Sequence, residues 1–265
     1  MRTDLGLSVN NSTSNAQDLQ TGSLPRRLVQ RVLGLFGLRI VRIHQDAPSG
    51  AHKYFNTGKL LPLEENSVEL NNTFYSDEQA LSEYYGADRL SFYDNVSAYL
   101  QGAGLAFDGK RILDVGCGVG FLLAALKTWT RPESMSGCDF SEAAITASRK
   151  RFPGHKFFVQ DIYQAIPGSY DIVLCTEVLE HLLHPDRGIQ NLYRAVRPGG
   201  WLVVTVPNGR VDNIIEHINF WSPESWGVFL NDQFPGHDVK VDTFRAGQNN
   251  IAIIRRPGDA GPKQS

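Results

Sequence analysis

A short apolar run that ends in a glycine-rich turn places the strongest constraint on how this chain can fold. The run 112–115 precedes the apolar segment 121–126, and glycine stands at alternate positions between them, at Gly116, Gly118 and Gly120. This order predicts a buried strand, a tight turn and the start of a helix. Glycines let a ligand approach the backbone closely, and a helix N-terminus directs unpaired N–H groups at it. Asp114, just before the turn, favours a ligand with positive charge.

From about residue 108 onward, strand-like and helix-like segments alternate, which is typical of a parallel sheet covered on both faces. We expect strands at 111–115, 135–138, 156–160, 171–175 and 201–206, and helices at 120–128, 141–152 and 186–196. The stretch 198–200 is expected to end the last of these helices. Runs 238–244 and 250–255 are joined by too little chain for a crossover helix, so they predict an antiparallel hairpin.

The chain before residue 108 divides by composition. Residues 1–23 and 257–265 are expected to be disordered tails, and 24–107 an N-terminal helical region that caps a domain at 108–256. Segment 24–44 carries five arginines at the edge of a helical apolar pattern. It is either a helix packed on the main domain or a basic helix that contacts an anionic membrane surface.

Two further helices are expected in the N-terminal region. Segment 48–72 is expected to be irregular. Ser76 with Gln79 has the spacing of a capping box and predicts a helix start, and a second helix is expected at 88–101.

Composition excludes several classes of protein. The net charge of −2 and the 42% hydrophobic content fit a globular protein rather than a disordered or nucleic-acid-coating one. Three scattered cysteines do not form a disulfide framework or a zinc site. No apolar run approaches the roughly 20 residues of a membrane span, and the N-terminus lacks the apolar core of a signal peptide. A cytoplasmic location is the expectation, and the oligomeric state stays open.

Acids follow successive apolar runs, at Asp114, Asp139, Asp161 and Glu177. Ligands of open parallel sheets bind at the carboxyl ends of the strands, so we expect these acids to share one site. Asp139 lies about 20 residues beyond the glycine turn, where a carboxylate accepts hydrogen bonds from ribose hydroxyls. Phe140 could lie against an adenine face, and Asp161 could accept from the exocyclic amine with Ile162 on the ring. The pattern therefore predicts an adenosine-shaped site with an acid beside the glycines for a cationic group.

The motif Asp114-x-Gly-x-Gly-x-Gly120, with Asp139, Asp161 and the segment 176–181, resembles the class I S-adenosylmethionine-dependent methyltransferases over about 108–256. The branch most similar contains ubiquinone-pathway O-methyltransferases and small-molecule, sugar and lipid methyltransferases. The resemblance implies an α/β fold with a doubly wound, mostly parallel sheet of seven strands in the order 3-2-1-4-5-7-6, strand 7 being antiparallel. It also implies S-adenosylmethionine as cofactor.

The resemblance also assigns residues to parts of the cofactor. Gly116, Cys117, Gly118 and Gly120 would line the methionine part, Asp139 would hold the ribose, and Asp161 the adenine amine. Thr176 and Glu177 would complete the cofactor site. Two alternatives stay open: a nicotinamide-dependent oxidoreductase, whose G-x-G-x-x-G pattern fails at Phe121, and a non-catalytic binding module on the same fold.

The segment Glu177-Val178-Leu179-Glu180-His181 has two interpretations. Some relatives use E-x-x-E-H to bind a divalent ion that holds the acceptor hydroxyl, and Mg²⁺ would suit such ligands. Alternatively, the acids serve the fold and His181 faces the acceptor. We assign no metal ligand here and expect His181 to be the general base, because its ordinary pKa suits proton transfer near neutral pH.

The acceptor side is expected in an insertion at 207–237. Aromatic and histidine side chains there either form a substrate wall or anchor the insertion to the core, namely His217, Phe220, Trp221 and Trp226. In the N-terminal region, Tyr84, Tyr85 and Arg89 are candidates for a lid or for the cofactor carboxylate.

The expected reaction is O-methylation of a small metabolite, glycan precursor or lipid intermediate. The alternatives are N-methylation of a small molecule, or a metal-assisted O-methylation of a quinone precursor or RNA end. A nucleic-acid partner is not expected, because no basic and aromatic track occurs in the domain.

Overall fold

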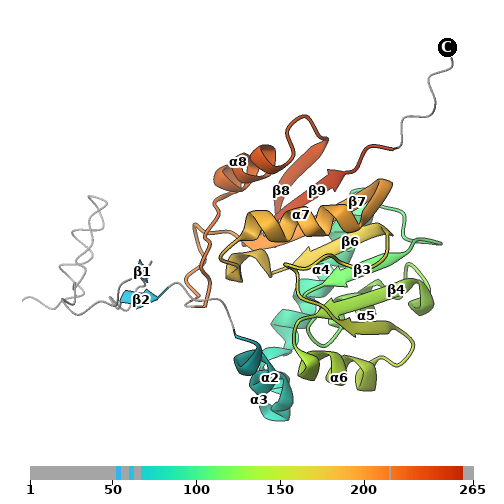
Figure 1. Cartoon of the computed structure of the whole chain (residues 1–265), viewed down its shortest axis with the longest axis vertical. Helices are drawn as coiled ribbons and strands as arrows, with labels where there is room; N and C mark the ends of the chain where they lie inside the picture. Colours follow the sequence, from blue (N-terminus) through green and yellow to red (C-terminus); the bar gives the residue numbers. More distant parts are fainter. Residues whose placement is uncertain (1–51, 55–59, 63–66, 215, 259–265) are drawn as a thin grey trace, which may run out of the picture. The chain divides into compact units, whose positions relative to one another are not determined.

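The computed structural model describes residues 52–54, 60–62, 67–214 and 216–258, all within the unit 46–265. Most of its strands belong to one sheet: β3 (Ile112–Val115), β4 (Met135–Asp139), β5 (Lys156–Val159), β6 (Tyr170–Thr176), β7 (Val196–Pro207), β8 (Val239–Phe244) and β9 (Asn249–Arg255). Their order across the sheet is β5-β4-β3-β6-β7-β9-β8 (Figure 1). β9 is antiparallel to both neighbours. This confirms the expected order 3-2-1-4-5-7-6 and the closing hairpin.

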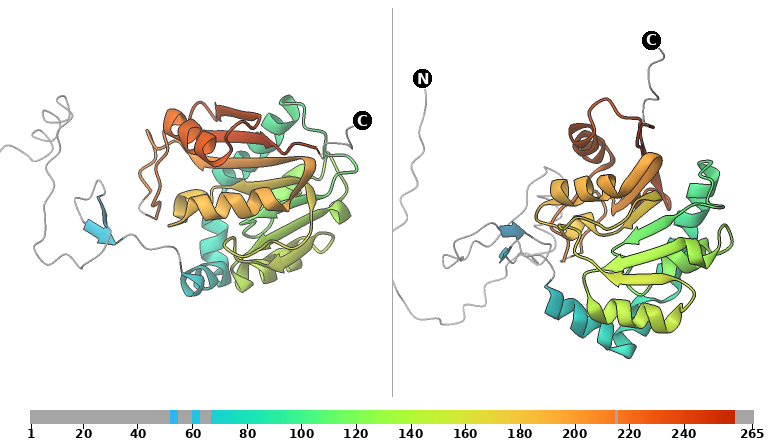
Figure 2. Two further views of the ribbon diagram at one scale, coloured as in Figure 1. Left: turned by 45° about the horizontal axis from the view of Figure 1, so that its top comes forward. Right: turned by 45° about the vertical axis from the view of Figure 1, so that its right-hand side comes forward.

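The sheet is covered by helices on both faces (Figure 2). Ile112 of β3 and Leu174 of β6 pack into the apolar cluster that includes side chains of the N-terminal helices. Leu113 and Val173, one position away in sequence, pack into the second cluster on the opposite face. All seven residues of β6 are buried, as expected for a central parallel strand with two covered faces.

Two helices of the main domain begin directly after a serine that caps them. The helices are α5 (Phe121–Leu126), α6 (Glu142–Arg151), α7 (Pro185–Ala195) and α8 (Pro223–Gln233). Ser141 caps α6, because its Oγ accepts the N–H of Ala144 at 3.1 Å. Ser222 caps α8 in the same way through the N–H of Ser225 at 3.2 Å. The short helix η2 (Leu179–His181) follows β6.

The N-terminal region differs from the expectation in two respects. Its helices are α2 (Val68–Ser76), α3 (Glu78–Tyr84) and α4 (Ala87–Gly102). Ser76 ends α2 rather than starting a helix, and Asp77 caps α3 by accepting the N–H groups of Gln79 and Ala80. The prediction of an irregular segment 48–72 is also wrong, because Ser67 caps α2 and β1 (His52–Tyr54) pairs with β2 (Leu60–Pro62). Adjacent capping residues made the sequence ambiguous here.

The strand expected at 201–206 is longer than predicted. β7 starts at Val196 and includes Pro198-Gly199-Gly200, which we expected to lie outside it. The pairing of β6 with β7 shifts register there, since Tyr170 pairs with Val196 but Ile172 pairs with Trp201. The extra residues of β7 between these two pairs form a bulge, and Gly199 within it has φ +77°.

Among the described helices, none combines the length and apolar character needed to cross a bilayer. The basic segment 24–44 and the tail 1–23 lie outside the described residues, as does most of the tail 257–265. The expectations for them, and the domain boundaries at 24 and 108, stay predictions.

Candidate active site

The glycine turn closes onto the neighbouring strand. The N–H groups of Gly116 and Cys117 both donate to the carbonyl oxygen of Cys138, at 2.8 and 3.0 Å. Gly118 has φ +50°, and a Cβ there would lie 2.5 Å from the hydroxyl oxygen of Tyr85. A side chain at this position would therefore collide with the helices above the turn, in addition to the backbone strain.

Asp139 lies at the end of β4, beside the turn. Its carboxylate accepts the N–H of Gly118 at 3.0 Å and the N–H of Ser141 at 2.9 Å. The same side chain therefore ties the glycine turn to the start of α6. Phe140 follows it and is half-buried. The ribose and adenine roles assigned to these two residues are proposals that this geometry allows.

Asp114 is a carboxyl group in an unfavourable place for a negative charge. Its side chain is 1% exposed, and its Oδ1 has no hydrogen-bond partner within the described residues. Burial, reinforced by the nearby charge of Asp139, raises the pKa of Asp114 to about 8. A cationic ligand beside this group would restore the charged form, which fits the expectation drawn from its position before the glycines.

The remaining candidates stand at the neighbouring strand ends in differing environments. Asp161 is exposed, and its Oδ1 accepts the N–H of Tyr163 at 2.8 Å. Ile162 is buried in the apolar cluster that α7 covers. Thr176 ends β6 and is buried. The structure thus brings the strand-end candidates to one edge of the sheet.

Helices α2 to α4 cover the glycine turn. The Oδ1 of Asn72 in α2 accepts the hydroxyl of Ser141 at 2.7 Å and the N–H of Ala143 at 3.3 Å. The Tyr75 hydroxyl would lie 3.2 Å from a Cβ at Gly118. Sequence reasoning missed Asn72 and Tyr75, because both fall in or beside the segment taken as irregular. The cap Ser67, three residues before Leu70, was the signal that could have revealed their helix.

Arg89 in α4 lies among aromatic rings. Its guanidinium carbon is 5.1 Å from the ring centre of Tyr84 and 5.4 Å from that of Tyr93. Its Nε is buried and makes no hydrogen bond within the described residues. A half-buried cationic side chain with an unsatisfied donor suits an anionic group of a ligand; its expected role at the cofactor carboxylate or in a lid stays a prediction.

Glu177 is held by the sheet itself. Its backbone has φ +55°, which is unusual for a residue other than glycine. The Thr205 hydroxyl donates to its Oε1 at 2.9 Å, and Asn249 Nδ2 donates to its Oε2 at 3.0 Å. Burial raises the pKa of Glu177, and the nearby positive charge of Arg89 opposes this shift. Both oxygens of Glu177 are thus bound to β7 and β9.

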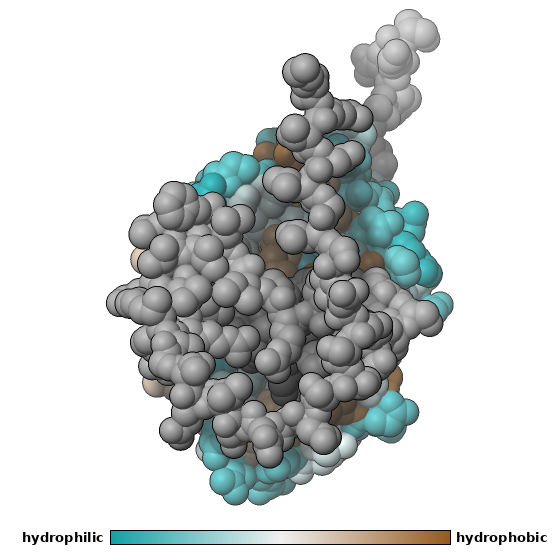
Figure 3. Space-filling view, turned by 90° about the vertical axis from the view of Figure 1, so that its left-hand side faces the viewer, coloured by the Kyte–Doolittle hydropathy of each residue, from teal (hydrophilic) through white to brown (hydrophobic). Residues whose placement is uncertain are grey.

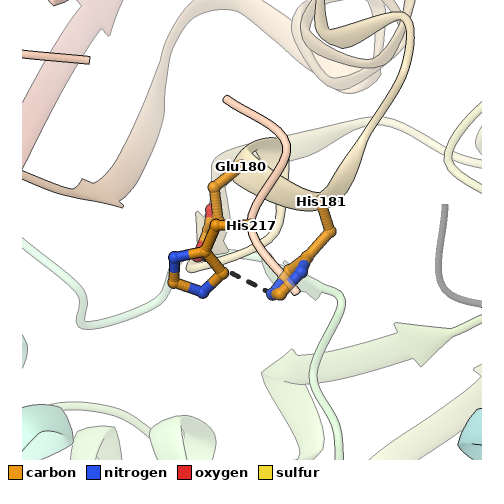
Figure 4. Close-up of side chains that lie close together, drawn as sticks. All are labelled: Glu180, His181 and His217. Carbon is orange, nitrogen blue, oxygen red and sulfur yellow. Dashed lines mark ion pairs between the residues drawn. The ribbon is translucent and has the colours of Figure 1, made fainter. Parts of the chain in front are cut away.

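Glu180, His181 and His217 form a compact cluster beside this edge (Figure 4). One potential ligand atom from each lies within 4.8 Å of the others. The Nε2 of His181 is 4.0 Å from Glu180 Oε1, and the two imidazole ring centres are 4.8 Å apart. Glu180 is completely buried, and neither of its carboxylate oxygens makes a hydrogen bond within the described residues. Burial and the negative charge of Glu177 raise the pKa of Glu180 well above its ordinary value.

The cluster unites two separate segments of the chain. η2 supplies Glu180 and His181, and the insertion supplies His217. Asn219 fastens the insertion to η2, because its Nδ2 donates to the carbonyl oxygens of Leu179 and Leu182 at 3.1 and 2.7 Å. Sequence reasoning placed His217 either on a substrate wall or among the anchors of the insertion, and did not connect it with Glu180. No periodic pattern marks a contact between two loops.

Of the two roles left open for the aromatic residues of the insertion, the structure shows the anchor for one residue, and the substrate wall stays a prediction. Trp226 is completely buried and stacks on Phe229 at 5.6 Å, so it anchors α8 to the core. Other apolar side chains near the cluster in sequence are exposed: Leu183, Val211, Ile214 and Phe220. Figure 3 shows apolar and hydrophilic surface side by side around the described part of the chain.

Curated relatives match the central part of the chain. The ubiquinone biosynthesis O-methyltransferase of Pseudomonas aeruginosa strain LESB58 is 34% identical over 113 residues, which cover 40% of this chain and 47% of that protein. The protein of the same name from Thiobacillus denitrificans is 36% identical over 107 residues, which cover 38% and 45%. The chain therefore spans about half the length of the curated relatives it matches.

Solved structures share the fold. A chain from the complex of the Haloferax volcanii Trm112 methyltransferase activator with a methyltransferase superposes with a TM-score of 0.57 at 17% identity, covering 71% of this chain and 97% of that one. A SAM-dependent methyltransferase from Aquifex aeolicus gives 0.54 at 17% identity, covering 68% and 98%.

The family described as "Methyltransferase domain" matches residues 87–239. This match covers more than half of the 265 residues and begins within α4, so it includes the glycine turn, the strand-end acids and the histidine cluster. The chain belongs to this family, and its fold is that of the class I S-adenosylmethionine-dependent methyltransferases.

Proposed function

We propose that the enzyme transfers the methyl group of S-adenosylmethionine to a hydroxyl of a small molecule, and that Glu180, His181 and His217 hold a divalent cation beside that hydroxyl. One observation carries this proposal. Glu180 is a fully buried carboxyl group without hydrogen bonds within the described residues, and one potential ligand atom from each of two imidazoles lies within 4.8 Å of the other and of Glu180. A buried carboxylate without hydrogen bonds is costly, and a cation would satisfy it.

The donor set fits a divalent transition metal. One carboxylate and two imidazoles suit Mn²⁺ or Fe²⁺ better than Mg²⁺, which prefers oxygen ligands. When bound, such a cation would act as a Lewis acid and lower the pKa of a hydroxyl in contact with it. We leave Glu177 out of the set, because the ligand atoms that lie within 4.8 Å of one another belong to Glu180, His181 and His217. The proposed ligands therefore differ from the E-x-x-E-H set considered in the sequence.

The residues of the chain would position the two reactants. The acceptor oxygen displaces the sulfur of S-adenosylmethionine in line: the new O–CH₃ bond forms, the S–CH₃ bond breaks to leave S-adenosylhomocysteine, and the hydroxyl proton passes to solvent water. Such a displacement depends mainly on proximity and orientation. His181 would help to hold the cation, in place of the role of independent base. Helices α2 to α4 would exclude water by covering the glycine turn.

The relatives support an oxygen acceptor. Both curated relatives described above are named O-methyltransferases of ubiquinone biosynthesis, which makes a phenolic ring hydroxyl the first acceptor to test. The exposed apolar side chains Val211, Ile214 and Phe220 would suit an acceptor with apolar surface. We propose a small molecule rather than a nucleic acid as the partner.

Methyl transfer from labelled S-adenosylmethionine to a panel of catechols, monophenols, amines and short RNA tests the proposal. We expect label in methyl ethers of catechols. EDTA should lower the rate at least about 100-fold and Mn²⁺ should restore it, because Lewis-acid stabilisation is worth several kcal/mol. Glu180→Gln should abolish the Mn²⁺ response. The exposed Glu216 supplies a matched control, and Glu216→Gln should retain the response.

Two other outcomes would correct the proposal. Label found only in amines would overturn O-methylation. Transfer to phenols that EDTA does not affect would overturn the cation and would return the role of general base to His181.

A further inference from the structure

A buried acid lies behind the histidine of the cluster. The Oδ2 of Asp212 is 2.6 Å from Nδ1 of His217, and the two side chains are 2% and 6% exposed. At this distance His217 donates its Nδ1–H to the carboxylate. A neutral imidazole with a proton on Nδ1 has its lone pair on Nε2, so Nε2 is the nitrogen with which His217 can bind a cation.

Asp212 is itself held in place. Its other oxygen, Oδ1, accepts the N–H of Ile214 at 3.1 Å, and its own N–H donates to the carbonyl oxygen of Asn208 at 3.0 Å. Asn208 in turn donates through Nδ2 to the carbonyl oxygen of Gly247 at 2.7 Å. The acid is therefore fixed to the turn between β8 and β9, and its position does not depend on the insertion alone.

The imidazole of His217 also belongs to the cluster. Its ring lies 4.8 Å from the ring of His181 at 79°, and Figure 4 shows the two rings and Glu180 close together. Asp212 thus binds one ring nitrogen of His217, while Glu180 and His181 are further neighbours of the ring. This is the arrangement by which an outer carboxylate orients a histidine ligand.

We propose that Asp212 is a positioning residue, which fixes the tautomer and orientation of His217 and thereby sets the affinity of the Glu180–His181–His217 cluster for a divalent cation. This inference rests on the proposed function. Asp212 touches neither the acceptor nor the cofactor in this account, and it acts through His217. Loss of such an outer partner lowers metal affinity by about 10- to 100-fold.

Asp212→Asn tests the inference with little change in shape. If the amide oxygen keeps the hydrogen bond from Ile214, the NH₂ group faces Nδ1 of His217 and reverses its tautomer. Mn²⁺ titration followed by electron paramagnetic resonance, with saturating S-adenosylhomocysteine at constant pH, should show affinity about 10- to 100-fold weaker. Affinity for S-adenosylhomocysteine should stay within about twofold, and saturating Mn²⁺ should recover most of the turnover.

Glu216→Gln is the matched control. It removes one negative charge at the residue next to His217, from an exposed side chain, and should change Mn²⁺ affinity less than about twofold, because exposed charges act weakly. A similar loss in both variants would show a general effect of charge and would overturn the inference.

The tautomer gives a second readout. Nitrogen NMR of the metal-free wild type should show His217 protonated at Nδ1, and this holds even if Asp212→Asn fails to fold. The opposite tautomer would overturn the inference. If the wild type binds Mn²⁺ and Asp212→Asn binds it with an affinity within about twofold of the wild type, the inference is also overturned. The proposed function would then survive. Wild type that binds no Mn²⁺ would overturn both.

Discussion

Replacing Asp114 by asparagine should change how the stability of the cofactor-free enzyme depends on pH. Burial and the charge of Asp139 raise the pKa of Asp114 to about 8 in the folded chain, from an ordinary 3.8. The folded state therefore holds this proton more tightly than the unfolded state. The contribution of Asp114 to the free energy of unfolding must fall as the pH rises from about 4 to about 8, because ionisation of this group then favours the unfolded chain.

The size of the effect follows from the shift. Between pH 5 and pH 7 the group is ionised when unfolded and protonated when folded. Its contribution to the wild type's free energy of unfolding should therefore fall by about 3 kcal/mol, at 1.36 kcal/mol for each pH unit. Asparagine cannot ionise and has nearly the same shape. The free energy of unfolding of Asp114→Asn minus that of the wild type should therefore rise by about 3 kcal/mol over this range.

Guanidinium unfolding at pH 5, 6 and 7, followed by tryptophan fluorescence, measures this difference. Asp161→Asn removes an exposed carboxyl from the same edge of the sheet and should show no comparable trend. A difference between Asp114→Asn and wild type that stays constant with pH would refute the reasoning, because it would show Asp114 to be charged in the folded protein.

Further predictions concern the lid, the cluster and a distant ion pair. Asn72→Ala removes the hydrogen bonds to Ser141 and Ala143 and should release S-adenosylhomocysteine about 30-fold faster in stopped flow, since two such bonds at about 1 kcal/mol each sum to about 2 kcal/mol. Glu180→Gln should lose Mn²⁺ binding in calorimetry yet bind S-adenosylhomocysteine within about twofold, because the amide retains the shape but not the charge. Arg197→Ala breaks a 2.6 Å ion pair with Asp171. It should cost about 1 kcal/mol in chemical unfolding, because the arginine is half-exposed, and leave turnover unchanged; a loss of turnover would contradict this.

The fold was largely predictable, because a parallel sheet leaves a strong trace in the sequence. Strands such as β6, buried on both faces, read as continuous apolar runs, and Ser141 and Ser222 mark helix starts by a local hydrogen bond. Where two adjacent residues could each cap a helix, as Ser76 and Asp77 could, local chemistry did not decide between them. In the structure, where Asp77 is the cap, Tyr85 lies against the glycine turn and Asn72 contacts Ser141 at the start of α6. These tertiary contacts cannot be read from the local sequence.

The cofactor edge and the acceptor side differed in how far they could be predicted. Asp114 and Asp139 lie at the carboxyl ends of β3 and β4, where parallel strands bring them together, so the sequence alone predicts that they are close. The pairing of Asp212 with His217, and of His217 with Glu180, joins irregular segments that share no period or spacing rule. Glu177 was expected at the cofactor, and its hydrogen bonds to Thr205 and Asn249 depend on the register of β7 with β9.

Electron spin-echo spectroscopy of Mn²⁺ bound to the enzyme, with S-adenosylhomocysteine present, shows directly which side chains hold the cation. We expect nitrogen couplings from two imidazoles, of which one disappears in His217→Ala and both remain in Glu216→Gln. Bound Mn²⁺ without imidazole couplings, or couplings that His217→Ala leaves unchanged, would contradict the assignment of Glu180, His181 and His217 as the centre that holds the acceptor hydroxyl.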